Sequence, residues 1–147
     1  MTDIALTLEH SVEADVSPAF AWRCRTDVAT WRDPPATFVL DGPFCDGSRG
    51  TTLMPGQDPL HWRVRNVLTE RSFTIEMPLD RATVCFEWCF DALSGRRTKL
   101  TQRIVLTGDN AEAYVRQIQT AFETMPAGMH RIASDLEAAE RFEDSAD

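Results

Sequence analysis

Apolar and polar residues alternate along most of the chain, which is the pattern of strands with one buried face. The first alternating run covers residues 4–12. Further runs cover residues 37–40, 50–54, 61–69, 72–77, 83–92 and 99–107. Turn-forming pairs such as Gly42-Pro43 and Ser94-Gly95 separate these later runs. Consecutive strands with such short connections predict an antiparallel meander.

Two short helices are expected between the first strand and the meander. Ser17 supplies an N-cap hydroxyl, and Pro18 follows at the first helical position, where its missing N–H costs nothing. Asp27 is placed to cap a second brief helix over residues 28–31, which must end before Pro34.

The pattern changes to helical spacing after residue 108. Apolar residues recur every three or four positions, at Tyr114, Ile118, Phe122, Met125, Met129, Ile132 and Leu136. This stripe predicts one long amphipathic helix. Asp109 and Glu112 match a capping box at its start, and Pro126 should kink it in the middle.

The alternation also sorts the strand residues into two faces. The inner face carries large aromatic side chains, at Trp62, Phe73, Phe86, Trp88 and Phe90. Three polar residues interrupt it: His10, Asn66 and Gln102. They are either core groups satisfied by the backbone or the lining of a hollow that holds ligand or water. The outer face carries charges such as Arg65, Arg103, Glu76 and Glu87, which predict cross-strand ion pairs.

Composition narrows the classes of partner. The chain has 147 residues and a formal net charge of −8, so nucleic acid and anionic membrane surfaces are excluded as partners. Its two ends are acidic around a mildly basic meander. No apolar run is long enough for stable membrane insertion, and the first six residues lack the pattern of a secretion signal. The four cysteines are expected to be reduced thiols in a cytoplasmic protein.

Motifs for metal, cofactor or nucleophile chemistry are missing from the sequence. His10, His61 and His130 fall on three separate predicted elements, so we expect no metal site and no cofactor. His10 is the one inner-face residue whose ordinary pKa suits general acid–base catalysis. Phe122, Met125 and Met129 form an adaptable apolar surface on the long helix, for ligand binding or for ordinary packing on the sheet.

Several short motifs, in order along the chain, resemble a known family. They are Val16 to Trp22, Thr26-Asp27 with Trp31, Leu40 to Phe44, Asp46 to Ser48, Gly95 to Thr98, Thr107-Gly108 and Met125 to Met129. Together they resemble the START/Bet v 1-like (SRPBCC) superfamily, and more narrowly its bacterial polyketide cyclase/dehydrase and lipid-transport branch. In one departure, Pro34-Pro35 stands where such proteins often have a second tryptophan, so the cavity mouth is expected to differ.

The resemblance implies an α+β helix-grip fold: one domain over residues 1–147, in which a curved seven-stranded antiparallel sheet wraps a long C-terminal helix and two short helices follow strand 1. It also implies a hydrophobic cavity between sheet and helix that holds a lipid- or polyketide-like molecule. The ligand-binding candidates are Trp31, Trp62, Asn66, Phe73, Phe86, Trp88, Phe90, Gln102, Phe122, Met125 and Met129.

Three functions stay open at this point. The first is binding of a small hydrophobic molecule without catalysis, favoured because no inner-face carboxylate accompanies His10. The second is a polyketide cyclase/dehydrase-type enzyme in which His10 acts as general acid or base. The third is an interaction protein, such as a homodimer formed through a sheet edge or the acidic C-terminal segment.

Overall fold

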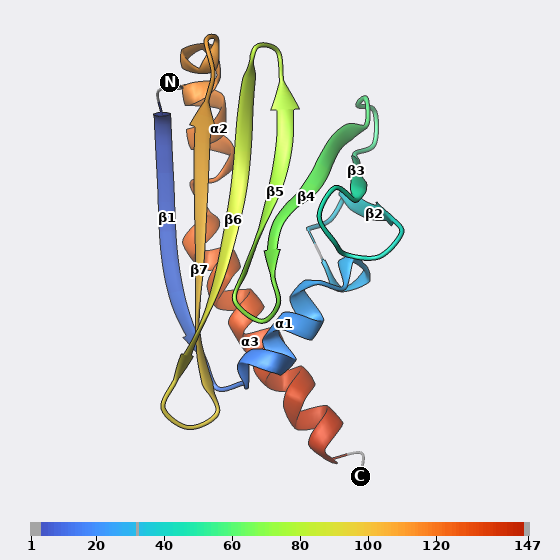
Figure 1. The fold of residues 1–147 in the computed structure, drawn as a ribbon, viewed down its shortest axis with the longest axis vertical. Coiled ribbons are helices and arrows are strands. Elements are labelled where there is room, and N and C mark those ends of the chain that lie inside the picture. Colours follow the sequence, from blue (N-terminus) through green and yellow to red (C-terminus); the bar gives the residue numbers. More distant parts are fainter. Residues whose placement is uncertain (1–3, 32, 146–147) are drawn as a thin grey trace.

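A seven-stranded antiparallel sheet forms most of the fold (Figure 1). The computed structural model of the chain describes residues 4–31 and 33–145, so the remainder of the predicted domain, residues 1–3, 32 and 146–147, lies outside the described residues. The strands are β1 (Ile4–Ala14), β2 (Thr37–Asp41), β3 (Arg49–Leu53), β4 (Leu60–Leu68), β5 (Ser72–Leu79), β6 (Ala82–Leu93) and β7 (Arg97–Thr107). Their order is β1-β7-β6-β5-β4-β3-β2. The predicted meander is therefore confirmed, with β1 added beside β7.

The two short helices between β1 and β2 begin where their caps predict. Helix α1 (Pro18–Arg25) follows Ser17, whose Oγ accepts the Phe20 N–H at 3.2 Å. The 3₁₀ helix η1 (Val28–Thr30) follows Asp27, whose carboxylate accepts the Ala29 N–H at 3.1 Å. Local hydrogen bonds that the sequence encodes thus fix where α1 and η1 begin.

The C-terminal helix is interrupted, not merely kinked. The structure has a 3₁₀ helix η2 (Ala111–Tyr114), then α2 (Val115–Ala121) and α3 (Met125–Ser145). A proline inside a helix loses one hydrogen bond and clashes with the carbonyl four residues earlier. The chain avoids both penalties, because α2 ends before Phe122 and Pro126 lies in the first turn of α3. The predicted capping box is wrong, since η2 starts after Asn110 without a side-chain cap.

Helix α3 runs obliquely across one face of the sheet, near β1, and α1 lies beside it (Figure 1). The core has two parts. One lies between α1, α3 and the sheet and includes Phe73, Trp88, Leu100 and Met129. The other lies under α2 and includes Val84, Ile104, Leu106 and Ile118. Residues predicted to face inward on β6 and β7 contribute to both parts: Trp88, Phe90 and Leu100 to the first, and Val84, Ile104 and Leu106 to the second.

The prediction that Asn66 lies on the inner face of the sheet is wrong. Asn66 is exposed and has a left-handed backbone, with φ of 53°. The pairing of β4 with β5 shifts register between Arg65 and Leu68, so an irregularity interrupts the alternation there. As a result Val67, not Asn66, packs against the core. A bulge of this kind reverses which residues face inward, and parity alone does not detect it.

Three further predictions can be compared with the structure. The outer-face ion pairs are confirmed, with Arg103 and Glu87 at 3.0 Å and Arg65 and Glu76 at 3.6 Å. All four cysteines are free, as expected. Within the described residues, no helix combines the length and apolar character needed to cross a membrane.

Candidate functional site

A row of four residues crosses the inner face of the sheet. Strand pairing places His10 opposite Gln102, Gln102 opposite Trp88, and Trp88 opposite Phe73. His10 and Gln102 are half-buried, whereas Trp88 and Phe73 are almost fully buried. The fold therefore brings four of the candidate residues side by side, with the polar ones toward β1 and the aromatic ones toward the middle of the sheet.

Phe73 is the centre of an aromatic cluster. Its ring lies 5.0 to 6.5 Å, between centroids, from those of Trp22, Phe44, Phe90 and Trp88. Only 1% of Phe73 is exposed. Such edge-to-face and offset pairs stabilise a core beyond their buried area. Phe73 and Phe90 are therefore packed core residues, and any surface that contacts a ligand must be formed by the side chains that cover them.

Trp31 and Trp62 pack against each other at the end of the molecule near η1. Their ring centroids are 5.6 Å apart, and Trp31 also packs against Phe38 on β2 at 5.6 Å. A hollow of about 500 Å³ opens beside Trp31, lined in part by Pro34 and Pro35. The two prolines thus lie at an opening, in the region where the sequence predicted an altered cavity mouth.

The helix candidates lie where the two parts of the core meet. Phe122 follows α2 and packs edge to face on Phe86 of β6, with centroids 5.3 Å apart. Met125 is half-buried and touches both parts of the core. Met129 is 2% exposed. Met129 is thus mainly a packing residue, while Phe122, Met125 and Phe86 retain accessible surface.

Arg25, which the sequence analysis did not single out, points into this aromatic interior. It is the last residue of α1. Its guanidinium carbon lies 4.6 Å from the ring centroid of Trp88 and 5.7 Å from that of Trp31. The Trp31 indole N–H donates to the backbone carbonyl of Arg25 at 2.8 Å, which fixes the two residues relative to each other. Arg25 is therefore held between a wall residue and the middle of the row.

The charge of Arg25 is poorly compensated. Its Nε is shielded from solvent and has no hydrogen-bond partner among the described residues. Burial lowers the pKa of Arg25 to about 10, which leaves the side chain cationic at neutral pH. Removing an ion from water costs several kcal/mol, whereas each cation–π contact returns roughly 0.5–2 kcal/mol. The interior therefore contains a positive charge that the described part of the chain does not balance.

His10 is the second interior group with an unused polar atom. Its Nε2 is buried and has no hydrogen-bond partner among the described residues. Its ring meets that of His130 on α3 edge to face, with centroids 5.6 Å apart. The sequence analysis placed these histidines on separate elements, and the docking of α3 on β1 brings them together. Among the residues that the structure describes, no group of three or more potential ligands is arranged to hold a metal ion.

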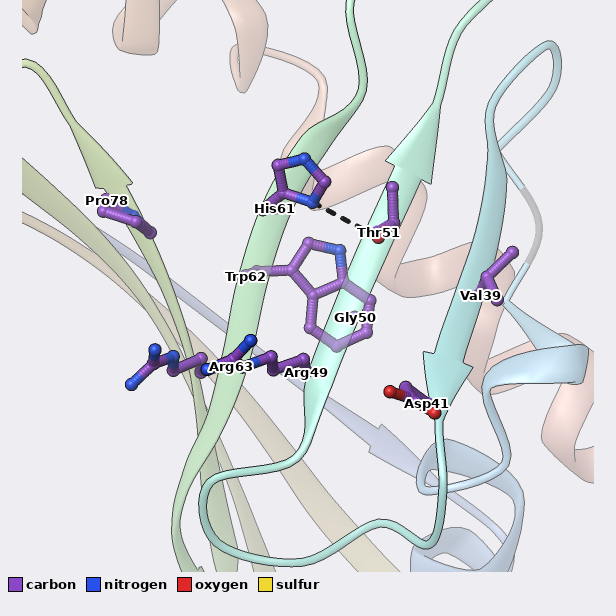
Figure 2. A pocket seen from close by; sticks show the side chains of 9 residues that line it. All are labelled: Val39, Asp41, Arg49, Gly50, Thr51, His61, Trp62, Arg63 and Pro78. Carbon is purple, nitrogen blue, oxygen red and sulfur yellow. Dashed lines mark hydrogen bonds between the residues drawn. The ribbon is translucent and has the colours of Figure 1, made fainter.

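A second groove lies on the opposite face of the sheet. Figure 2 shows the side chains of β2, β3 and β4 that line its volume of about 540 Å³, among them Asp41, Arg49, His61 and Arg63. The Thr51 hydroxyl and Nδ1 of His61 form a hydrogen bond of 3.4 Å in this groove. The indole of Trp62 lies directly under Gly50, where an added Cβ would overlap the ring. Apart from Trp62, no predicted site residue lines this outer groove.

The comparisons with known proteins agree with this architecture. No protein-family model and no curated protein sequence matches the chain. Among solved structures, it is similar to a point mutant of norcoclaurine synthase from Thalictrum flavum in complex with a transition-state analogue. That match has a TM-score of 0.72 and 13% identity, over 96% of this chain and 98% of the other.

A second similar structure is the Zhui aromatase/cyclase from Streptomyces sp. R1128. Its TM-score is 0.65 and its identity 14%, over 93% of this chain and 94% of that one. Similarity at this level of identity concerns the fold. The chain has the Bet v 1 helix-grip fold, as its motifs predicted.

Proposed function

We propose that the protein binds a small, mainly apolar molecule between the concave face of the sheet and helices α1 and α3. The observation that carries the proposal is a pair of shielded atoms, Nε of Arg25 and Nε2 of His10, for which residues 4–31 and 33–145 supply no hydrogen-bond partner. Buried polar atoms in proteins are nearly always hydrogen-bonded. A bound molecule that reaches this row would supply the missing partners.

The ligand surface consists of the candidates that keep accessible area. These are Trp31, Phe86, Gln102, Phe122 and Met125, with Trp62, Trp88 and Met129 behind them. Phe73 and Phe90 support them from below. The similar structures lend support, because one is described as holding a transition-state analogue and the other as an aromatase/cyclase.

The test uses 2-naphthamide as a neutral aromatic probe in isothermal titration calorimetry and thermal unfolding. We expect saturable one-to-one binding and a higher melting temperature, because a ligand that binds only the folded state stabilises it. Gln102→Trp puts a large ring between His10 and Trp88, fills the proposed binding space and should abolish binding. Val39→Trp adds the same ring at the rim of the outer groove, where Val39 is 49% exposed, and should leave binding unchanged.

The reverse outcome, in which Val39→Trp blocks the probe and Gln102→Trp does not, places the ligand in the outer groove and contradicts the proposal. Near-ultraviolet circular dichroism checks that each variant is folded. If Gln102→Trp does not fold, Met125→Trp serves as the filling variant, since Met125 is half-buried beside the same interior.

A second candidate function is catalysis of the cyclase/dehydrase type. It is favoured by the unpartnered Nε2 of His10, because a general acid or base needs a free ring nitrogen within reach of the substrate. His10→Gln should then abolish turnover of a poly-β-ketone substrate while 2-naphthamide still binds. Turnover that persists in His10→Gln would remove this candidate and leave the binding function intact.

Two predictions about the surroundings of the protein remain proposals. Strands β1 and β2 form the two ends of the sheet order, so a homodimer would use one of these edges or the acidic C-terminal segment. Light scattering measures the oligomeric state. Cytoplasmic localisation, expected from the cysteine content, is tested by cell fractionation.

A further inference from the structure

We propose that the ligand carries a planar carboxylate, and that Arg25 binds this group between Trp31 and Trp88. The inference rests on the proposed binding function and specifies the chemical class of the ligand. It starts from the position of the guanidinium, whose carbon is 4.6 Å from the Trp88 ring centroid and 5.7 Å from that of Trp31. Trp88 belongs to the part of the core between α1, α3 and the sheet, and Trp31 packs against that part.

The acidic residues near α1 are already committed to other partners. Glu143 is paired with Arg23 at 2.7 Å. Glu140 accepts hydrogen bonds from Ser17 and is paired with Arg96. Asp27 is exposed and caps η1. Among residues 4–31 and 33–145, no carboxylate lies within ion-pair distance, 4.0 Å, of the Arg25 guanidinium.

The shape of the site favours a carboxylate over a phosphate. A guanidinium presents a planar fork of N–H donors that matches the two oxygens of a carboxylate. The indoles of Trp31 and Trp88 lie against Arg25 as flat apolar surfaces, which suit a planar group and an attached aromatic body. A phosphate dianion would need a second cation, but every other described lysine and arginine is exposed except Arg65, which is half-buried and paired with Glu76.

The remaining interior groups fit a ligand with a polar end and an apolar body. Gln102 lies next to Trp88 in the row, and His10 lies next to Gln102. Neighbouring strands are about 4.8 Å apart, so the row from Trp88 to His10 spans about 10 Å. A carboxylate at Arg25 would leave the body of the ligand to extend along this row toward β1, within reach of the unpartnered Nε2 of His10.

The experiment compares a matched pair of probes, 2-naphthoate and 2-naphthamide, by isothermal titration calorimetry on the full chain. We expect the wild-type protein to bind 2-naphthoate about ten- to a hundredfold more tightly, the span of one or two charge-assisted hydrogen bonds. Arg25→Met keeps an unbranched side chain but removes the guanidinium, and should reduce this preference to less than about threefold, since one lost ion-pair interaction accounts for the difference.

Two further variants complete the design. Arg23→Met removes an exposed arginine from the same helix and should retain the full preference for 2-naphthoate. Arg25→Lys keeps the charge but loses the planar fork, and should retain part of the preference. If Arg25→Met does not fold, Arg25→Lys decides the question, because an unchanged preference in that variant contradicts the planar, two-point contact.

The outcomes separate the two proposals. Equal affinity for both probes in the wild-type protein, or a preference that survives in Arg25→Met, overturns the carboxylate inference alone. Binding of neither probe overturns the proposed function and this inference together. A preference that is lost in Arg25→Met and kept in Arg23→Met supports both.

Discussion

Two ionisable side chains are shielded from solvent in different ways: Glu140, near the C-terminal end of α3, is buried, and Arg25, at the end of α1, is half-buried. Glu140 is 7% exposed, and its carboxylate accepts the backbone N–H and hydroxyl of Ser17 at 3.4 and 3.3 Å. Arg96 lies 3.2 Å from the same oxygen. Arg25, in contrast, lies against two indole rings, and its Nε has no hydrogen-bond partner in the described part of the chain.

This difference in hydrogen-bond partners indicates that Glu140 has a structural role and Arg25 a functional one. Glu140 joins the start of α1 to α3 and to the β6–β7 hairpin, so its partners are all supplied by the fold. Arg25 contributes little to holding the fold together and imposes a desolvation cost. Groups that cost stability without a compensating contact are concentrated at binding and catalytic sites. Stability measurements therefore test the assignment independently of any ligand.

The largest expected effect is on the structural charge. Glu140→Leu should lower the free energy of unfolding by about 2–3 kcal/mol, because hydrogen bonds to a charged group are lost and the Ser17 donors are left unpaired. Urea denaturation followed by circular dichroism measures the change. Glu140→Gln keeps an acceptor and should cost less. A loss below about 0.5 kcal/mol in Glu140→Leu, the range of ordinary surface substitutions, would contradict the structural role.

The second effect has the opposite sign. Arg25→Met should raise the free energy of unfolding of the unliganded protein by about 1–2 kcal/mol, because an unbranched apolar side chain replaces a half-buried charge whose Nε is shielded from solvent. Arg23→Met is the matched control. Its salt bridge to Glu143 is exposed, so its removal should change stability by less than about 1 kcal/mol. A clear loss of stability in Arg25→Met would show that the two cation–π contacts make Arg25 a structural residue.

The smallest effect concerns the thiol beside Arg25 in the sequence. Burial raises the pKa of the Cys24 thiol above its ordinary value, despite the opposing influence of Arg23. We therefore expect iodoacetamide at pH 8 to alkylate the exposed Cys45 well before Cys24, and the rate at Cys24 to rise at higher pH as its thiolate forms. Peptide mass spectrometry measures both rates. Faster reaction at Cys24 would mean that the neighbouring arginine charge, and not burial, dominates the pKa of this thiol.

Much of the fold was predictable because its signals are local. The alternation of β6 and β7, the Ser17 cap and the Asp27 cap each depend on residues close together in the chain, and the structure confirms them. The misplaced Asn66 shows the limit of the same reasoning. A single residue with positive φ shifts the strand register, and the apolar pattern contains no mark of it.

The site was less predictable because it depends on how distant elements dock. Arg25 lies on a short helix, and its burial follows only from the position of α1 against Trp88 on β6. His130 likewise meets His10 only once α3 packs on β1. The alternation of the strand predicts that Gln102 faces inward. It does not predict that Arg25 lies over Trp88, the neighbour of Gln102. One usable signal was present: Arg25 lies between two of the motifs that carried the resemblance, Val16 to Trp22 and Thr26-Asp27 with Trp31.

The contact between Gly50 and Trp62 has a consequence for redesign of this protein. The indole fills the space that any side chain at residue 50 would need, so the two positions share one volume. Enlarging one is tolerable only if the other shrinks in the same step. Trp62 also packs on Trp31 at the wall of the hollow. An exchange of bulk between positions 50 and 62 would therefore open space beside Trp31 while keeping the total packed volume of the sheet, a compensating pair through which ligand size could be varied.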